Sequence, residues 1–424
     1  MKHIFVLGMD EKQLKELRSV RSADTMKFHG VLDATTLVES EEINFGKLLD
    51  DCRASIKSKG EDVHAILAHW DFPTSVLAPI LAAEFGVKYP SLTSILKCEH
   101  KYWSRLEQSR VAKDFVPRFA WFDPFDETTG SPLDFPFWIK PIKSFSSQLG
   151  FLIENEEQFE QARLVIQKGI GRIGVAFNEA LTYAQLPDEI TAVTGKSCIA
   201  EGLLTGTQLA IEGSVIDGKY NVHGVLDMTR SEHGKNLGCL VYPSQAPLAI
   251  QETMIEISEK YLKHIGFDNG CFNAEFIWDE LENRLSIIEF NTRISHSHSE
   301  LFLMVDGMSN HEIALEAATG QHDGLPQGKG PCRVAAKFIH SRSLDGVMVK
   351  APTPEAIAAI ENSVGNVRID WYPKDGSVLS TLPNQDAYHY VLCDIYIGAN
   401  EPEELLQKYR ASLAQLDYRI TDLS

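Results

Sequence analysis

The feature that most constrains this chain is a hairpin predicted over residues 271–293. Two runs of interleaved apolar and polar residues, Cys271–Asp279 and Leu285–Arg293, flank a polar turn, Glu280–Arg284. This alternation is typical of two paired strands, because successive side chains of a strand point to opposite faces. We therefore expect an antiparallel pair whose polar face carries acidic and amide side chains.

Two glutamates of this hairpin are expected to face each other. With the turn centred on Glu282, Glu275 lies directly opposite Glu289, at the ~4.5–5.5 Å Cβ spacing where like charges repel. A cation between them would remove the repulsion, and two carboxylates with the Asn291 amide oxygen suit Mg²⁺. Mg²⁺ bound in this way takes further ligands from phosphates and water, which predicts a nucleotide-dependent enzyme. The alternative is a solvated acidic face, and a one-residue shift of the turn would break the pairing.

Length, charge and cysteine usage narrow the class of protein. The 424 residues are enough for two to three domains, and a net charge of −19 argues against a nucleic-acid partner. The seven cysteines include no C-x-x-C pair, which indicates free thiols in a reducing compartment. No apolar stretch approaches the ~20 residues of a membrane span, and the apolar start is too short for a secretory signal. We therefore expect a cytoplasmic protein without a membrane partner.

The chain divides into three predicted parts. Residues 1–95 alternate strand and helix, the pattern of a small parallel-sheet α/β domain, and lack the G-x-G-x-x-G of dinucleotide binding. Residues 96–325 mix strands and helices around the hairpin, and a Gly- and Pro-rich linker (324–331) follows. Residues 326–424 are predicted to form an α+β domain with a structural or dimerising role. The expected fold class is therefore α/β and α+β.

Two lysines of the middle part are candidate phosphate ligands. Lys140 ends a predicted strand (136–141) and precedes a Ser-rich loop, and a lysine with the N–H groups of such a loop can hold phosphates. Lys101 stands at the start of a helical segment. An exposed surface position is the alternative for each lysine, and the P-loop pattern is absent.

Taken in order along the chain, these segments resemble the ATP-grasp superfamily. The motifs that carry the resemblance, within residues 65–320, are Lys101 before a helix, Lys140-Pro141 with the Ser-rich loop, Glu201-Gly202-Leu203-Leu204, Glu275, and Glu289-x-Asn291-x-Arg293. The resemblance implies that residues 96–325 form an ATP-grasp domain, in which ATP lies between two α+β subdomains. The three-part layout is similar to that of biotin carboxylase.

The resemblance also implies a role for each matched residue. The implied ATP contacts comprise phosphate lysines, a closing serine loop, an adenine hinge and a ribose neighbour: Lys101, Lys140, Ser144, Ser146, Ser147, Glu201, Gly202, Leu203, Leu204 and Gln208. Within the hinge, Glu201 would accept a hydrogen bond from the adenine amino group. The implied ligands of one or two Mg²⁺ ions, with Mn²⁺ as a substitute, are Glu275, Glu289 and Asn291. Arg293, together with Lys140, is the implied catalytic group, because it would hold the reacting carboxylate and stabilise the oxyanion.

The sequence departs from the family pattern around the acceptor site. A glutamate is common where Gln208 stands, and Ile-Ser-His-Ser-His-Ser follows Arg293 in place of a Gly pair or Pro-Gly. Thr229, Arg230 and His233 stand where the family often contacts substrate. The segment with His296 and His298 is expected to shape the acceptor site, and these two histidines are candidates for a base or a second metal site. For His296 and His298 the alternative is a histidine that is satisfied within its loop.

The resemblance implies an ATP-dependent carboxylate–amine ligase of the amino acid or peptide type. It would work through an acyl phosphate, release ADP and phosphate, and use a small-molecule carboxylate and amine. Two alternatives stay open: a biotin-carboxylase-like carboxylation, and a synapsin-like ATP-binding protein with little catalysis. The sequence leaves the substrates unnamed, since acceptor pockets vary independently of the ATP machinery. A homodimer with two-fold symmetry is the commonest assembly for such an enzyme.

Overall fold

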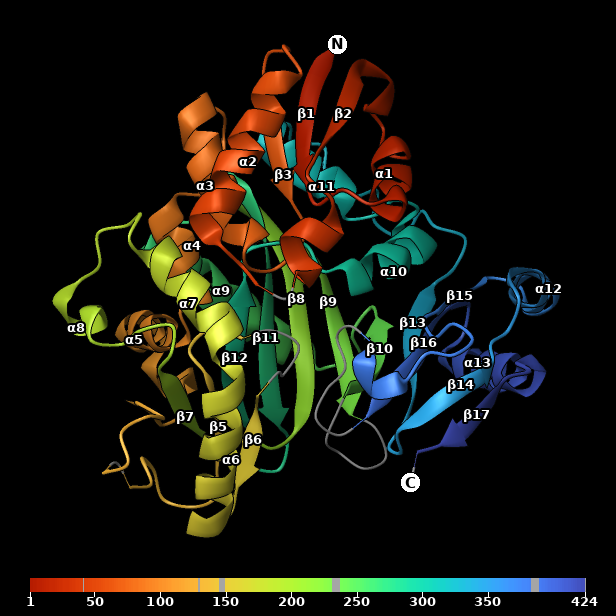
Figure 1. Cartoon of the computed structure of the whole chain (residues 1–424). Helices are drawn as coiled ribbons and strands as arrows, with labels where there is room; N and C mark the ends of the chain where they lie inside the picture. The colour runs from red at the N-terminus through yellow and green to blue at the C-terminus, as the bar shows by residue number, and fades with distance from the viewer. Residues whose placement is uncertain (41, 129, 145–148, 231–236, 383–388, 424) are drawn as a thin grey trace.

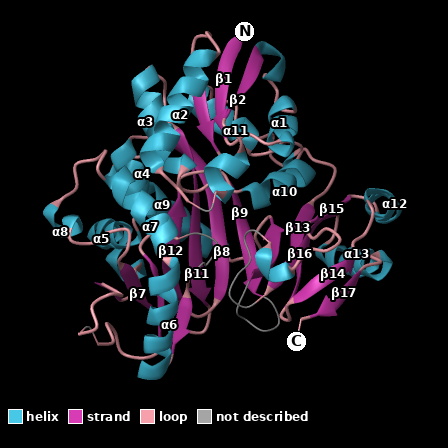
Figure 2. Ribbon diagram, viewed as in Figure 1, coloured by secondary structure: helices cyan, strands magenta, loops and turns pink. Residues whose placement is uncertain are grey.

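The computed structural model describes residues 1–40, 42–128, 130–144, 149–230, 237–382 and 389–423, with only the backbone for Arg230 and Leu237. The described strands form sheets of three, eight, two and four strands. In the view of Figures 1 and 2 the N-terminal part lies at the top. The four-stranded sheet with α6 lies at the lower left, and the C-terminal strands lie at the right.

The N-terminal part is a parallel sheet with helices on both faces. Its strand order is β2-β1-β3, with β1 at Lys2–Leu7, β2 at Met26–Val31 and β3 at Ala65–Ala68. Its helices are α1 (Glu11–Arg18), α2 (Phe45–Ser58), α3 (Thr74–Phe85) and α4 (Leu92–Glu99). One face of the sheet packs against α2 and α3, and the other against α1 and α11 (His311–Thr319). Burial on both faces explains why β3 is entirely apolar.

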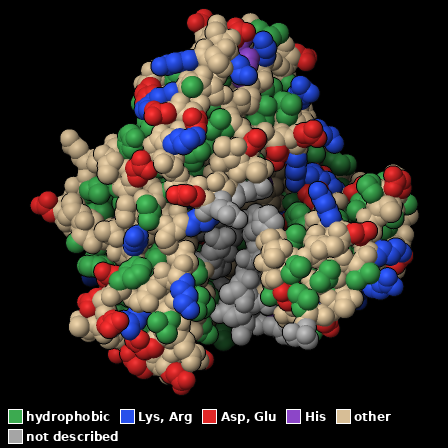
Figure 3. All heavy atoms as spheres, viewed as in Figure 1, with side chains coloured by type: hydrophobic (Ala, Val, Ile, Leu, Met, Phe, Trp, Pro, Cys, Tyr) green, Lys and Arg blue, Asp and Glu red, His purple; other side chains and the backbone are tan. Residues whose placement is uncertain are grey.

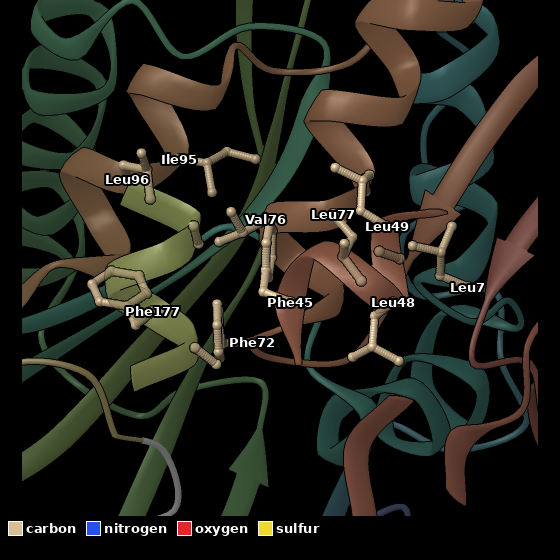
Figure 4. Close-up of a cluster of buried hydrophobic side chains, with 14 of the residues drawn as sticks. Leu7, Phe45, Leu48, Leu49, Phe72, Val76, Leu77, Ile95, Leu96 and Phe177 are labelled. Atoms are coloured by element: carbon tan, nitrogen blue, oxygen red, sulfur yellow. The ribbon is translucent and has the colours of Figure 1, made fainter. Parts of the chain in front are cut away.

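A hydrophobic cluster joins this part to α7 (Gly171–Leu181) of the middle part. The ring of Phe45 stacks on Phe72 with 5.9 Å between centroids, and Phe72 meets Phe177 edge-on at 5.4 Å. Figure 4 shows these rings among the buried side chains of the cluster. Burial of each such side chain stabilises the fold by about 1.5–3 kcal/mol. Because Phe72 directly follows Asp71, this packing also fixes the backbone that presents Asp71.

The middle part contributes a four-stranded antiparallel sheet. Its strand order is β4-β7-β5-β6. The strands are β4 (Phe119–Phe122), β5 (Phe137–Pro141), β6 (Phe151–Ile153) and β7 (Cys198–Gly202). The helices of this region are α5 (Lys101–Ala112), α6 (Glu156–Gly169), α7 and α8 (Asp188–Thr191). The apolar side of α6 packs on the strands through Phe159 and Ile166, which meet Phe137 and Ile139.

The largest sheet has eight antiparallel strands in the order β12-β11-β8-β9-β10-β13-β16-β15. The strands from the middle part are β8 (Thr207–Ile216), β9 (Lys219–Arg230), β10 (Leu237–Tyr242), β11 (Gly270–Asp279) and β12 (Arg284–Asn291). The strands from the C-terminal part are β13 (Val334–Arg342), β15 (Val367–Trp371) and β16 (Tyr390–Ala399). Helix α9 (Leu248–Ile265) packs on one face, and α10 (His296–Asp306) with α11 packs on the other.

The predicted hairpin is β11–β12, and its register contains a bulge. From Asp279↔Arg284 to Phe276↔Ile287 the pairs follow one register, whereas Glu275 pairs with Glu289. Ile288 is therefore the extra residue of the bulge. Without it, Glu275 would face Ile288, and the two carboxylates would lie on opposite faces.

The C-terminal part adds two helices and a small second sheet. The helices are α12 (Pro354–Val364) and α13 (Pro402–Gln415), and the sheet pairs β14 (Gly346–Lys350) with β17 (Arg419–Asp422). The predicted α/β and α+β fold class is confirmed. None of the described helices is long and apolar enough to cross a membrane.

Candidate active site

The opposed carboxylates lie at the edge of the large sheet. Glu275 on β11 pairs directly with Glu289 on β12, as the alternation of the sequence predicts. The Gln208 amide on β8 donates to Glu275 Oε2 at 2.8 Å, and Asn291 Nδ2 lies 3.5 Å from Glu275 Oε1. Gln208, expected near the ribose, therefore contacts a carboxylate of the candidate metal site.

The two carboxylates differ in their electrostatic surroundings. Burial, followed by the charge of Glu289, raises the pKa of Glu275 to about 7. Burial also acts to raise the pKa of Glu289, but the charges of Lys101, Lys140 and Lys143 together hold it below its ordinary value. Glu275 thus stays partly protonated near neutral pH unless a cation arrives between the two groups.

Three lysines gather beside this pair. Lys101 Nζ donates to the Ser144 carbonyl at 2.7 Å, and burial lowers the pKa of Lys101 to about 8. Lys140 Nζ lies 2.8 Å from Glu201 Oε2. Lys143 forms a buried ion pair with Glu99. Lys143 was not predicted, although its spacing of three residues from Lys140 at the end of β5 was a readable signal.

The Glu201 carboxylate is held by two cations. Arg105 Nε lies 2.6 Å from Glu201 Oε1, and Lys140 binds the other oxygen. Burial opposes ionisation, yet these cations lower the pKa of Glu201 to about 2. Each oxygen has one donor and keeps a further lone pair, so the expected contact with an adenine amino group stays a prediction, as do the contacts of the hinge backbone. Arg105 also donates to the carbonyl groups of Ile287 and Ile288, and so ties the hinge to the bulge.

Glycine is required at the end of the hinge. Gly206 has φ +122°, and a Cβ atom there would lie 2.2 Å from the Trp278 carbonyl oxygen. Gly206→Ala is expected to reduce the free energy of unfolding by about 1–3 kcal/mol through overpacking. Urea denaturation measures this, with Gly60→Ala as a control. Gly60 also has positive φ but no neighbour within 4 Å of a Cβ, so equal losses would mean that backbone strain alone is responsible.

Arg293 is paired with an aspartate of the N-terminal part. Its Nε and Nη2 donate to the two oxygens of Asp71 at 2.9 and 2.8 Å, and Nη1 donates to the Ile294 carbonyl at 3.2 Å. Burial acts to raise the pKa of Asp71, but Arg293 holds it below its ordinary value. One N–H of Nη1 and one of Nη2 remain for a further oxygen ligand. Asp71 was not predicted from the sequence, although polar residues that follow a buried parallel strand often line a binding site.

The predicted substrate residues and the predicted loop serines differ in their surroundings. His298 is buried with its Nδ1 2.6 Å from Glu212, itself buried, which is the arrangement of a histidine satisfied within the protein; its substrate role stays a prediction. Ser144 is also buried and contributes its carbonyl to Lys101. Ser146, Ser147 and His233 lie outside the described residues, as does the side chain of Arg230.

His296 is half-buried and lies close to two other histidines. Its ring centroid is 6.1 Å from that of His69 and 5.9 Å from that of His311. Burial lowers the pKa of His296 to about 3 and that of His69 well below its ordinary value.

These pKa shifts predict a pH dependence of stability. Because both folded-state pKa values lie below the unfolded-state value of about 6.5, the unfolded chain binds more protons as pH falls below that value. The unfolding free energy is therefore expected to fall below pH ~6.5, by about 1.4 kcal/mol per pH unit for each histidine. Urea denaturation between pH 7.5 and 5.5 measures the slope. His296→Gln should reduce this slope by the contribution of one histidine, about 1.4 kcal/mol per pH unit. An unchanged slope would show that His296 is not kept neutral in the folded protein.

The donor set of this region fits Mg²⁺ and a polyphosphate. The opposed, half-buried carboxylates need a cation between them, and the three nearby lysines can neutralise phosphate charge. Among the described residues, no group of three or more His, Cys, Asp and Glu side chains is arranged to hold a metal ion. The remaining ligands of a Mg²⁺ ion here would therefore come from Asn291, phosphates and water, which is usual for this ion.

Comparison with known proteins identifies the domain and the fold. Residues 133–299 match the sequence model of the ATP-grasp domain, whereas no curated protein sequence matches the chain. The fold is similar to that of an L-amino acid ligase from Bacillus licheniformis, with a TM-score of 0.73, 15% identity, and 99% of each chain covered. Biotin carboxylase from Campylobacter jejuni gives a TM-score of 0.65 and 16% identity, over 99% of this chain and 93% of that one.

A third solved structure is the biotin carboxylase domain dimer of 2-oxoglutarate carboxylase from Hydrogenobacter thermophilus. That domain was solved with MgADP, ADP and bicarbonate. It gives a TM-score of 0.60 and 15% identity, over 100% of this chain and 91% of that one.

Proposed function

Because the chain belongs to the ATP-grasp superfamily, we propose that it is an ATP-dependent carboxylate–amine ligase that releases ADP and phosphate. The observation that carries the proposal is the pairing of Glu275 with Glu289 beside a guanidinium, Arg293, and three lysines. The carboxylate pair suits Mg²⁺, the lysines suit phosphates, and the guanidinium suits a carboxylate. A simple ATP binder has no need of the last group.

The residues of the chain have distinct tasks in this reaction. Glu275, Glu289 and Asn291 would hold Mg²⁺, which neutralises phosphate charge when bound. Lys101 and Lys140 would orient the phosphate chain, since phosphoryl transfer depends on positioning and charge neutralisation.

Arg293 would bind the substrate carboxylate through the N–H groups that Asp71 and Ile294 leave free. The carboxylate accepts the γ-phosphoryl group and becomes an acyl phosphate, which an amine then attacks. Arg293 would also stabilise the oxyanion that forms on this carbon. The hinge from Glu201 to Leu204 would meet the adenine edge through its backbone.

A bicarbonate-dependent carboxylation is the second candidate. The similarity in fold to biotin carboxylases over nearly the whole chain favours it. Against it, these 424 residues contain no Met-Lys-Met biotin attachment site. Stimulation of ATP hydrolysis by bicarbonate with free biotin would identify this reaction.

The test is phosphate release from ATP and Mg²⁺ with pooled amino acids and small carboxylic acids, followed by mass spectrometry. A ligase requires two pool components and gives a product mass equal to their condensation. ATP-dependent thermal stabilisation without phosphate release from any pool would refute the proposal and indicate an ATP-binding protein. Gel filtration of the same sample tests the homodimer.

A further inference from the structure

Three histidines from separate elements form a cluster beside Arg293, here called the imidazole cluster. His69 follows β3, His296 begins α10 and His311 begins α11. The ring of His69 meets that of His311 edge-on at 4.8 Å between centroids, and the other two separations are 5.9 and 6.1 Å. The proposed function gives no task to this cluster.

Several buried polar atoms of the imidazole cluster and of the neighbouring Gln13 on α1 have no protein partner. They are His69 Nε2, His311 Nε2 and Gln13 Oε1, on side chains at most 3% exposed. His311 Nδ1 lies 2.9 Å from Glu16 Oε2, so this nitrogen donates to the carboxylate and Nε2 of the neutral ring is an acceptor. Buried atoms of this kind normally have a partner. Gln13 Oε1 and, in the neutral ring, His311 Nε2 are acceptors. A ligand group with several N–H donors would satisfy both.

Burial favours the neutral form of two rings of the cluster, His69 and His296. Burial is the first cause of the low pKa values of His69 and His296, and the other imidazoles contribute next. The charged groups that act on His296 are Arg293 after β12 and Glu16 and Lys12 from α1. Behind them, Asp71 pairs with Arg293, and Arg368 lies 4.0 Å from Glu16 and pairs with Glu300. Glu16 is the carboxylate in contact with a ring of the cluster, and it can stabilise a proton on His311.

A primary ammonium group fits these acceptors. It carries three N–H donors, and neutral imidazoles can both bind it and take one of its protons. A transition metal is a poorer match, because no described set of three histidine or acidic side chains is arranged to hold one.

The cluster also lies where an amine would be needed. Of the three histidines, His69 lines a cavity of about 30 Å³ together with Thr292 and Arg293, and His311 meets His69 from outside this lining. The Thr292 hydroxyl is another buried atom without a partner. His296 is the partly exposed member and lies three residues after Arg293. The group proposed to hold the electrophile and the imidazole cluster are therefore neighbours.

We propose that the imidazole cluster binds the amino group of the amine substrate and that His311, oriented by Glu16, removes its proton. This rests on the proposed ligase function and names the site of its second substrate. The amine arrives as R–NH3⁺, and one proton passes to His311 Nε2. The nitrogen lone pair forms the C–N bond, the C–O bond to phosphate breaks, and its electron pair leaves with phosphate. The second proton passes from nitrogen to the departing phosphate, and His311 returns its proton to solvent.

The test compares two nucleophiles with the carboxylate that the pooled assay identifies. One is the identified amine, which is protonated at neutral pH, and the other is hydroxylamine, which is not. In the first variant, His311→Asn, the amide can still reach Glu16 but no base remains. The second variant, Glu16→Gln, removes the carboxylate that is proposed to orient His311. The control is His264→Asn, because His264 also pairs with a glutamate, Glu107 at 2.6 Å, on a different helix.

With the amine, kcat/KM should fall at least ~10²-fold in His311→Asn, the usual contribution of general base catalysis. With hydroxylamine it should stay within about threefold. Equal loss with both nucleophiles would mean a structural role, and full activity with both would mean that the cavity holds only a water. Either result overturns the inference. A wild-type protein that releases no ADP with either nucleophile would overturn the ligase function itself.

Discussion

Replacement of Glu289 by alanine is expected to lower ADP formation at least ~10³-fold, the largest effect predicted for this protein. The change removes one of two opposed carboxylates and leaves Lys101, Lys140 and Lys143 without the charge that they surround. A bound cation supplies several kcal/mol of charge stabilisation, and each ~1.4 kcal/mol is a factor of ten in rate. The measurement is phosphate release at saturating ATP and Mg²⁺.

The matched control is Glu282→Ala, which removes an exposed glutamate from the turn of the same hairpin. It should leave turnover within about twofold. Both variants should melt near the wild-type temperature without nucleotide, but Glu289→Ala should lose the rise in melting temperature that Mg²⁺ and ATP give together. If Glu289→Ala retains turnover, the carboxylate pair does not hold the metal.

Arg293→Ala is expected to lower kcat by about 10²–10³, with little change in KM for ATP. The guanidinium is proposed to act on the carboxylate and its oxyanion, and loss of one such electrostatic contact has this effect. Steady-state kinetics with the identified substrates measures it. A rise in KM for ATP at constant kcat would instead assign Arg293 to the nucleotide.

Replacement of Asp71 provides a second test of the role of Arg293. Since Asp71 takes Nε and Nη2 of Arg293, it fixes the edge that the guanidinium presents to a ligand. Asp71→Asn should lower kcat about tenfold in the wild type but hardly at all in the Arg293→Ala background, because coupled residues are not additive. Additive losses would mean that Asp71 acts independently of Arg293.

The order of strands and helices was largely readable from the sequence. The strand–helix alternation of residues 1–95 and the hairpin over 271–293 are patterns of this local kind. The continuation of the large sheet from β10 into β13 was not readable, because pairing between distant strands leaves no local periodicity. The domain boundaries at 95 and 325 stay predictions.

The candidate site was readable where its residues share one hairpin. The pairing of Glu275 with Glu289 was predicted from a turn centred on Glu282, whereas the structure reaches it through the bulge at Ile288. The contacts of Asp71, Arg105 and Lys143 were missed, since each depends on tertiary packing between elements distant in sequence. The same holds for Glu201, because its partners Arg105 and Lys140 come from other elements of the fold.

The shared sheet has a consequence for how new specificities can arise in this architecture. β13 lies between β10 and β16, so removal of the last hundred residues would leave the N–H and C=O groups of β10 without partners along one side. An unrelated C-terminal module could not be exchanged for this one unless it also restored that edge. Specificity would therefore diverge by substitution on the existing strands and helices, and the C-terminal segment would be inherited together with the ATP machinery.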